Sequence, residues 1–253
     1  MALLEVAQIR RAFGGLLALD NVSFQVQPGQ IKGVIGPNGA GKTTLFNIIA
    51  GALRPHAGAV RFAGRDLTGL RPFQIAARGV SRTFQKPSLF LRLSVLENVM
   101  VGRHVRTRRG FLACALALPA QRREEQAIRA AALQQLERFQ LAADADRPVG
   151  DLSFGNRRLV ELARALATEP RLLLLDEPAS GLNTRETDDL AREIRRIRDS
   201  GITVLLVEHD MSLVMEVCDE ILALNFGTPI AEGPPAAIRN HPRVVEVYLG
   251  GQV

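Results

Sequence analysis

The sequence has few of the residues that cross-link a chain or stack on flat aromatic ligands. It contains two cysteines, no tryptophan and a single tyrosine. Cys114 and Cys218 both stand in apolar surroundings, and two cysteines are too few for a disulfide framework or a cysteine-based metal site. We therefore expect two reduced core thiols. The scarcity of aromatic residues also argues against the aromatic and basic surface that binds single-stranded nucleic acid.

Long apolar runs are also missing. No stretch reaches the roughly 18 uncharged apolar residues that a membrane-spanning helix requires, and the longest apolar run extends only from Gly110 to Pro119. Near the N-terminus, Glu5 and Gln8 interrupt the segment before an apolar core forms, so it lacks the order of a secretory signal. We expect a protein of the cytosol.

What the sequence does contain is enough apolar material for a sizeable core. Its 253 residues, 47% of them hydrophobic, fit one large α/β domain or two tightly joined lobes. The net charge of +6 favours a basic surface that attracts nucleic acid, anionic lipid or anionic ligands. Because most basic residues are arginine, genomic base composition explains this excess equally well. The charge alone does not choose among these readings.

The order of local patterns indicates an α/β fold with an inserted helical part. The first third reads as three strands, a Gly-rich turn and a helix, with the ordered segments at residues 3–9, 22–26, 31–35 and 42–50. Residues 95–167 read as mostly helical, with helices at 121–139 and 155–168. The last third reads as strand, helix and strand at 172–175, 185–200 and 203–207. This alternation predicts a parallel-sheet core covered on both faces and a projecting α-helical subdomain.

A glycine-rich phosphate-loop motif follows the strand at residues 31–35. Gly36, Gly41, Lys42 and Thr43 complete the pattern G-x-x-x-x-G-K-T. In this pattern glycines let backbone N–H groups wrap phosphates, the lysine reaches the terminal phosphates and the threonine hydroxyl binds Mg²⁺. The following helix adds its positive N-terminal end. A plain Gly-rich turn between strand and helix is the alternative.

Two carboxylates end the apolar strand near residue 175. The position of Asp176 predicts that it lies at the sheet edge near the phosphate loop, where it can hold Mg²⁺. The next residue, Glu177, should point to the opposite side, where it can accept a proton from attacking water. Acidic residues also begin many ordinary loops, so this pair is informative chiefly together with the phosphate loop.

The segment Leu152-Ser153-Phe154-Gly155-Asn156 resembles the signature motif of ABC ATPases, usually written L-S-G-G-Q. Its serine hydroxyl and helix-terminal N–H groups suit the γ-phosphate of a nucleotide held by another subunit. A capped helix start is the alternative, since serine is a favoured N-cap. The sequence departs from the family pattern at Phe154, at Asn156 and at Asn183, where many ABC proteins have aspartate. The shorter amide of Asn156 leaves its contact to the opposite nucleotide water-mediated or lost.

Other short segments follow the order of motifs in this family. Gln85 in Thr83-Phe-Gln85 resembles the Q-loop, Ser180-Gly-Leu-Asn183 the D-loop, and His209 the switch histidine, while Phe13 stands where the family stacks an aromatic ring on adenine. Each has an ordinary alternative: a polar turn residue for Gln85, a hydrogen-bonded strand-end residue for His209 and a core residue for Phe13. The resemblance implies a single ABC ATPase domain over residues 1–253, with a nucleotide-binding core at 1–94 and 168–253 and a helical subdomain at 95–167. The fold it implies is a P-loop NTPase core with a parallel sheet, an N-terminal antiparallel β part and the inserted α-helical subdomain.

The resemblance also assigns roles to individual residues. Expected catalytic residues are Glu177, His209, Gln85 and Lys42. Expected ATP-binding residues are Phe13, Gly36, Pro37, Asn38, Gly39, Ala40, Gly41, Lys42, Thr43, Thr44, Ser153, Gly155 and Asn156. Expected Mg²⁺ ligands are Thr43, Gln85 and Asp176.

Further short segments resemble the ATPase subunits of importers for branched-chain and related amino acids. They are Phe13-Gly-Gly, Arg82-Thr-Phe-Gln85, Glu208-His-Asp-Met211 and Tyr248-Leu-Gly250. Such subunits carry a longer segment after the Q-loop, here residues 102–126, which either contacts a membrane partner or lipid headgroups or forms a buried helix after a solvated basic stretch.

The resemblance implies several partners and a location. The expected partners are a second ATPase subunit, identical or paralogous, transmembrane permease subunits and, indirectly, an extracytoplasmic solute-binding protein, with no nucleic acid. The expected location is the cytoplasmic face of the cell membrane, reached through the permease. A soluble ABC ATPase acting on DNA or the ribosome is the alternative function. It usually carries a coiled-coil insertion or two linked ATPase domains, and the sequence has one phosphate loop and no sustained heptad pattern. A small-molecule kinase is opposed by the signature-like segment.

Overall fold

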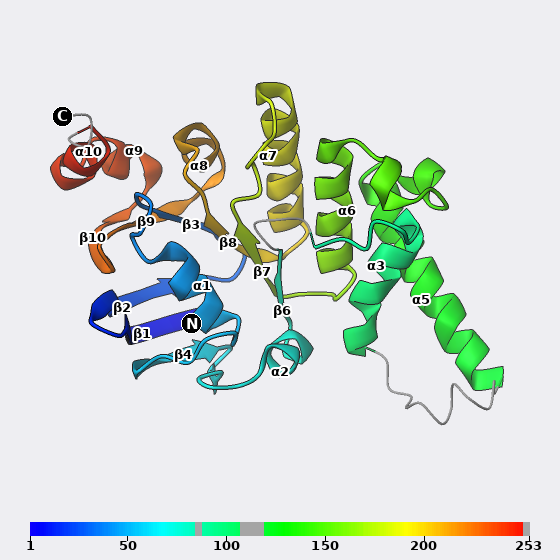
Figure 1. Cartoon of the computed structure of the whole chain (residues 1–253), viewed down its shortest axis with the longest axis horizontal. Coiled ribbons are helices and arrows are strands. Elements are labelled where there is room, and N and C mark those ends of the chain that lie inside the picture. The colour runs from blue at the N-terminus through cyan, green and yellow to red at the C-terminus, as the bar shows by residue number, and fades with distance from the viewer. Residues whose placement is uncertain (84–87, 107–118, 250–253) are drawn as a thin grey trace.

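The computed structural model describes residues 1–83, 88–106 and 119–249, which form two sheets and a set of helices (Figure 1). A four-stranded sheet has the order β2-β1-β4-β5, and a six-stranded sheet has the order β10-β9-β3-β8-β7-β6. The predicted fold class is confirmed, since parallel strands, an antiparallel N-terminal sheet and a helical part are all present.

The smaller sheet is antiparallel and comes from the first 66 residues. Its strands are β1 (Leu4–Phe13), β2 (Leu16–Val26), β4 (Ala57–Phe62) and β5 (Arg65–Asp66). A Gly-Gly turn joins β1 to β2, with Gly14 at φ 56°, where a residue with a side chain is strained. In β2, Val22, Phe24 and Val26 are buried while the residues between them are exposed, so one face packs on the core.

Five parallel strands make up most of the larger sheet. They are β3 (Ile31–Ile35), β6 (Val80–Arg82), β7 (Leu172–Asp176), β8 (Thr203–Val207) and β9 (Glu220–Asn225). The strands predicted at 31–35 and 203–207 have the observed bounds. An antiparallel edge strand, β10 (Thr228–Gly233), pairs with β9 and was not predicted from the sequence.

Both faces of this sheet are buried, which explains the apolar runs of β7 and β8. In β7, Leu173 and Leu175 belong to a core shared with α6 (Phe154–Leu166) and α7 (Thr184–Asp199). Leu172 and Leu174 belong to a second core, shared with α1 (Lys42–Ile49) and the antiparallel sheet. Alternate side chains of one strand therefore hold two layers together.

The helices gather mainly at one end of the molecule and along one face of the larger sheet (Figure 1). Helices α3 (Val95–Arg103), α5 (Pro119–Arg138) and α6 pack together at the end away from α9 (Pro235–Arg239) and α10 (Pro242–Leu249). The remaining helices are α2 (Pro72–Ala77) and α8 (Met211–Val217), with short 3₁₀ turns η1 (His104–Arg106), η2 (Ala142–Asp144) and η3 (Val149–Asp151). Among the described helices, none is both long and apolar enough to cross a membrane.

Candidate functional site

The phosphate loop connects β3 to α1 and has a backbone path that only glycine permits at two positions. A Cβ atom added to Gly36 would lie 2.3 Å from the Leu224 carbonyl oxygen. Gly41 has φ 96°, and its added Cβ would lie 2.5 Å from the carbonyl oxygen of Ala18. The loop is also anchored from the far side, because the Gly227 N–H donates to the Ala40 carbonyl at 3.1 Å. Packing against β2 and the β9–β10 turn therefore holds the loop in shape.

At the end of this loop, α1 begins at a glycine N-cap that provides no side-chain hydrogen bond. The first-turn N–H groups of a helix lack intrahelical partners, and they attract anions. Thr43 is exposed in this first turn. The predicted nucleotide residues Gly36–Gly41 thus form the loop after a buried strand, and Lys42, Thr43 and Thr44 begin the uncapped helix that follows.

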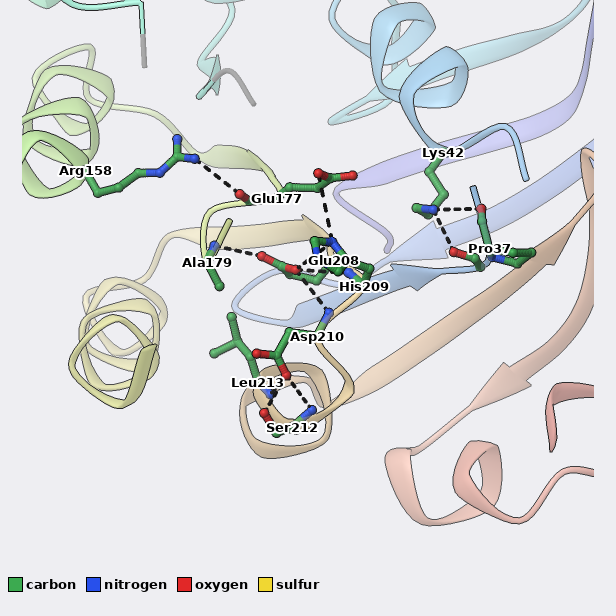
Figure 2. A network of polar contacts seen from close by, with 11 residues as sticks. Pro37, Lys42, Arg158, Glu177, Ala179, Glu208, His209, Asp210, Ser212 and Leu213 are labelled. Carbon is green, nitrogen blue, oxygen red and sulfur yellow. Dashed lines mark hydrogen bonds and ion pairs between the residues drawn. The ribbon is translucent and has the colours of Figure 1, made fainter. Parts of the chain in front are cut away.

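Lys42 places a positive charge at the centre of the loop. Its side chain is 6% exposed, and Nζ donates to the carbonyl oxygens of Gly36 at 2.7 Å and Pro37 at 3.0 Å (Figure 2). Burial lowers the pKa of this ammonium group, while the nearby carboxylates of Glu177, Asp176 and Glu208 oppose that shift. The three carboxylates therefore lie close enough to Lys42 to interact with its charge.

Asp176 ends β7 inside the protein, and an arginine from the neighbouring strand contacts it. Its side chain is 3% exposed, and Oδ2 lies 2.8 Å from Nη2 of Arg82 in β6. Arg82 also donates from Nη1 to Oδ1 of Asn47 in α1 at 2.7 Å. Arg82 was not among the residues predicted for the site. Its partner in β7 is 94 residues away in sequence, so no local pattern indicates the contact.

Glu177 has a strained backbone that turns the chain sharply after β7. It has φ 47°, a region that residues with side chains rarely occupy. Its N–H donates to the Val207 carbonyl at 2.9 Å, and its own carbonyl accepts from Arg158 Nη2 at 3.4 Å. Its Oε2 lies 3.9 Å from Nδ1 of His209, whose side chain is 58% exposed (Figure 2). The structure thus brings together the two residues predicted as base and switch histidine.

A second buried carboxylate, Glu208, lies beside this pair and was missed by the sequence analysis. It is fully buried and accepts hydrogen bonds from backbone N–H groups of Ala179, His209 and Asp210 (Figure 2). Burial raises the pKa of Glu208, and the hydrogen bonds from Ala179, Asp210 and His209 partly offset this. A glutamate after an apolar strand resembles an ordinary loop residue. The one sequence signal for a role of Glu208 is its position directly before His209.

The signature-like segment begins α6, which lies well apart from α1 (Figure 1). Ser153 is the N-cap, and its hydroxyl accepts from the Asn156 N–H at 3.2 Å. A Cβ on Gly155 would lie 2.7 Å from Oε1 of Glu186, so this segment packs closely on the start of α7. The capped-helix interpretation of Ser153 is correct as local structure. It does not exclude a second role toward another subunit.

The phenylalanine and asparagine that depart from the family pattern have local contacts here. The Phe154 ring lies 5.8 Å from the Arg158 guanidinium and packs where a Cβ on Gly181 would stand. Asn183 is the N-cap of α7 and forms a capping box with Glu186. Asparagine caps a helix as well as aspartate does, so this departure preserves the local fold.

The two remaining predicted residues lie at the periphery of the described structure. Phe13 ends β1, is 47% exposed and has the Arg11 guanidinium 4.9 Å from its ring centre. An exposed face is what stacking on a nucleotide base requires, and it argues against a core role. Gln85 lies outside the described residues, as do Cys114 and residues 107–118 of the segment that follows the Q-loop. Cys218 is buried and free, as expected.

The donor set is compatible with Mg²⁺ bound together with a nucleotide. Mg²⁺ uses one or two protein oxygens plus substrate phosphates and waters, and here a threonine hydroxyl and a buried carboxylate stand at adjacent strand and helix ends. Within the described ranges, no three or more His, Cys, Asp or Glu residues form a group that could hold a metal ion. The fold and this site define a P-loop nucleotide-binding protein.

Comparisons with known proteins narrow that class. The family model described as "ABC transporter" matches residues 19–180, and the model described as "Branched-chain amino acid ATP-binding cassette transporter" matches residues 228–253. The high-affinity branched-chain amino acid transport ATP-binding protein BraF of Pseudomonas aeruginosa is 45% identical over 249 residues, 98% of each chain. LivG of Escherichia coli, with the same description, is 43% identical over 249 residues, again 98% of each chain.

Solved structures agree with this grouping. A crystal structure of the ADP conformation of an ATP-binding cassette of an ABC transporter matches with a TM-score of 0.86 and 33% identity, covering 99% of each chain. The chain belongs to the ABC transporter family, as an ATP-binding cassette that hydrolyses ATP to drive transport.

Proposed function

We propose that this chain is the ATPase subunit of an importer for branched-chain or related amino acids. The observation that carries the proposal is the pairing of two matches: the ABC transporter model over residues 19–180 and the branched-chain-specific model over residues 228–253. Relatives at 43–45% identity over the full chain carry the same description. These matches do not favour the alternative of a soluble ABC ATPase acting on DNA or the ribosome.

We assign the steps of hydrolysis to the residues around the phosphate loop. Lys42, which now bonds to loop carbonyls, would turn to the β- and γ-phosphates. Thr43, Asp176 and Gln85 would hold Mg²⁺, which neutralises phosphate charge when bound. Glu177 would accept the proton of the attacking water. His209, which lies beside Glu177, would contact the γ-phosphate.

We assign nucleotide binding to two copies of the chain, or to one copy and a paralogue. Phe13 would stack on adenine, and Ser153, Gly155 and Asn156 would contact the γ-phosphate bound by the other subunit. The separation of α6 from α1 supports this arrangement, because the starts of these two helices in one chain are too far apart to bind the same phosphate (Figure 1). Closure would trap two ATP, and hydrolysis would reopen the dimer.

We further propose that residues 95–167 act as a helical subdomain between the core at 1–94 and 168–253. Its packed helices α3, α5 and α6 would contact permease subunits together with the segment around Gln85. The chain would thereby attach to the cytoplasmic face of the membrane, with a solute-binding protein on the outer side.

Transport by the reconstituted complex tests the proposal. Proteoliposomes that contain the chain, its permease subunits and the solute-binding protein should take up labelled leucine, isoleucine or valine only with ATP. The Lys42→Ala chain is the control and should support no uptake. The isolated chain should not bind leucine with micromolar affinity, since the solute site is assigned to the other subunits. Uptake restricted to unrelated solutes would overturn the substrate assignment.

A further inference from the structure

Two loops at the carboxyl edge of the central sheet are joined by a single buried carboxylate. The first loop follows β7 and carries Glu177 and Ala179, and the second follows β8 and carries His209. Glu208 Oε1 accepts from the Ala179 N–H at 2.8 Å. Glu208 Oε2 accepts from the N–H groups of His209 at 3.0 Å and Asp210 at 3.3 Å (Figure 2). Oε1 therefore binds the loop after β7, and Oε2 binds the loop after β8.

Burying the Glu208 carboxylate costs free energy, and the hydrogen bonds from both loops offset that cost. A fully buried carboxylate loses its hydration, and that loss is tolerable only where hydrogen bonds replace water. A glutamine at this position has one acceptor oxygen and places an N–H₂ group against one set of N–H donors. A shorter aspartate keeps the charge but cannot reach both loops. Among these side chains, only a glutamate carboxylate satisfies both sets of donors at once.

The two loops that Glu208 joins also carry the side chains proposed to act in hydrolysis. Glu177 Oε2 lies 3.9 Å from His209 Nδ1, and Ala179 is only two residues beyond Glu177. The separation between the base and the histidine therefore depends on the separation between the two loops. In the described part of the chain, the Glu177 N–H also donates to the Val207 carbonyl at 2.9 Å, so the ends of β7 and β8 are joined there, while Glu208 joins the loops beyond them.

We infer that Glu208 is a positioning residue that sets the distance between Glu177 and His209. The inference rests on the proposed roles of those two residues in hydrolysis. Glu208 is fully buried, and its carboxylate accepts hydrogen bonds from the backbone of the two loops. It holds the backbone of Ala179 and His209, and its Oε2 also lies 3.7 Å from His209 Nδ1, so that the Glu177 and His209 side chains approach the γ-phosphate in one fixed arrangement.

Steady-state hydrolysis by the full chain, measured for Glu208→Gln, tests the inference. Because a displacement of about 1 Å in a catalytic group costs up to roughly 100-fold in rate, kcat should fall about 10- to 100-fold. The KM for ATP and the number of ATP-binding sites should stay within about twofold of the parent, since Lys42 and the phosphate loop are untouched. Glu216→Gln is the matched control: Glu216 lies on α8, is 44% exposed and pairs with Arg195, so its kcat should equal that of the parent.

A shorter acid and an exchange measurement keep the test decisive. Glu208→Asp retains the charge and should fold even where Glu208→Gln does not, yet it should lose a similar factor in kcat because it cannot hold Ala179. Hydrogen exchange at the Ala179 amide should accelerate in both variants, while amides within β7 and β8 stay protected. A parental kcat in either folded variant, or a loss matched by lost ATP-binding sites, would overturn the inference. Absence of Lys42-dependent hydrolysis in the parent would instead overturn the proposed function.

Discussion

Arg82 and Asp176 form an ion pair at the carboxyl end of the central sheet, with Nη2 and Oδ2 2.8 Å apart. Both side chains are largely buried, at 12% and 3% exposure. Arg82 also bonds to Asn47, so it connects β6, β7 and α1 at one point. The proposed metal ligand Asp176 is therefore held in one orientation by a residue three positions before Gln85.

Replacing this arginine should weaken Mg²⁺ binding. In Arg82→Gln the carboxylate of Asp176 loses its orienting partner, and replacing a residue that hydrogen-bonds to a metal ligand typically costs about 10- to 100-fold in metal affinity. We expect the Mg²⁺ concentration for half-maximal ATPase activity to rise by about that factor. Arg192→Gln, which removes an exposed ion pair with Asp189 on α7, should leave it unchanged. A lower Mg²⁺ requirement in Arg82→Gln would indicate that the arginine competes with the metal.

Lys42→Ala should abolish ATP hydrolysis and weaken ATP binding. The variant removes the positive charge that lies among the phosphate-loop carbonyls and beside three carboxylates. Phosphate release and the Kd of a fluorescent ATP analogue are the measurements. Turnover at the parental rate would contradict the phosphate-loop assignment.

The parts of this structure that could be predicted from sequence are those with a local cause. The short, mostly apolar segments 31–35 and 172–175 were predicted as strands beside a glycine turn and an acidic pair, and Ser153 is an N-cap because its own hydroxyl reaches the Asn156 N–H. Each of these features depends on neighbours in the chain. The predictions for the phosphate loop, Asp176 and Glu177 rest on local patterns of the same kind.

The parts that could not be predicted depend on contacts between distant residues. The Arg82–Asp176 pair joins residues 94 positions apart, and Glu208 bonds to Ala179 across 29 positions. Nothing near Arg82 or Glu208 in sequence indicates their partners, because the sheet order that brings β6, β7 and β8 together is itself nonlocal. The edge strand β10, which begins at Thr228 and includes Pro229, lacks the apolar run that identified the central strands.

Gly41→Ala should destabilise the protein, whereas Gly15→Ala should not. Gly41 has φ 96°, and a Cβ there would meet the Ala18 carbonyl at 2.5 Å, while a Cβ on Gly15 meets nothing within 4 Å. A residue forced into this backbone region costs of order 1–3 kcal/mol before the steric contact is counted. Urea unfolding should show a loss of at least that size for Gly41→Ala alone. Equal stability of the two variants would mean that the loop adopts another path.

The Cys218 thiol should resist alkylation in the folded protein. Burial raises its pKa from 9.0 to about 12, so the reactive thiolate is scarce at pH 8 and the sulfur is shielded. Iodoacetamide labelling followed by peptide mapping separates Cys218 from Cys114 without mutation. Because the folded-state pKa is the higher one, the contribution of this group to stability is present below pH 9 and is lost as pH rises toward 12. Rapid labelling of native Cys218 at pH 8 would show that the site opens.

Glu177→Gln should trap ATP and produce a dimer. The change keeps the size of the side chain but removes the group able to accept a proton from water, and loss of a general base costs about 100-fold or more. Binding should survive, since Lys42, Thr43 and Asp176 are unchanged. ATP held in this way should bridge two subunits through Ser153 and Gly155, so sedimentation should show a dimer with Mg²⁺-ATP but not with ADP.

Adding Ser153→Arg to the Glu177→Gln chain should abolish that dimer. The bulky cation would block the γ-phosphate contact of the opposite nucleotide while each phosphate loop stays intact. Because Ser153 is also the N-cap of α6, losing it costs about 1 kcal/mol of helix stability by itself. Ser94→Arg is the matched control, since Ser94 caps α3 in the same way, with its side chain accepting from Glu97, and lies outside the proposed contact. The Glu177→Gln, Ser94→Arg chain should therefore remain an ATP-dependent dimer, with the native paralogue supplied where the partner is not identical. A Glu177→Gln chain that stays monomeric with ATP and that paralogue, or hydrolyses ATP at the parental rate, would exclude the proposed dimer mechanism.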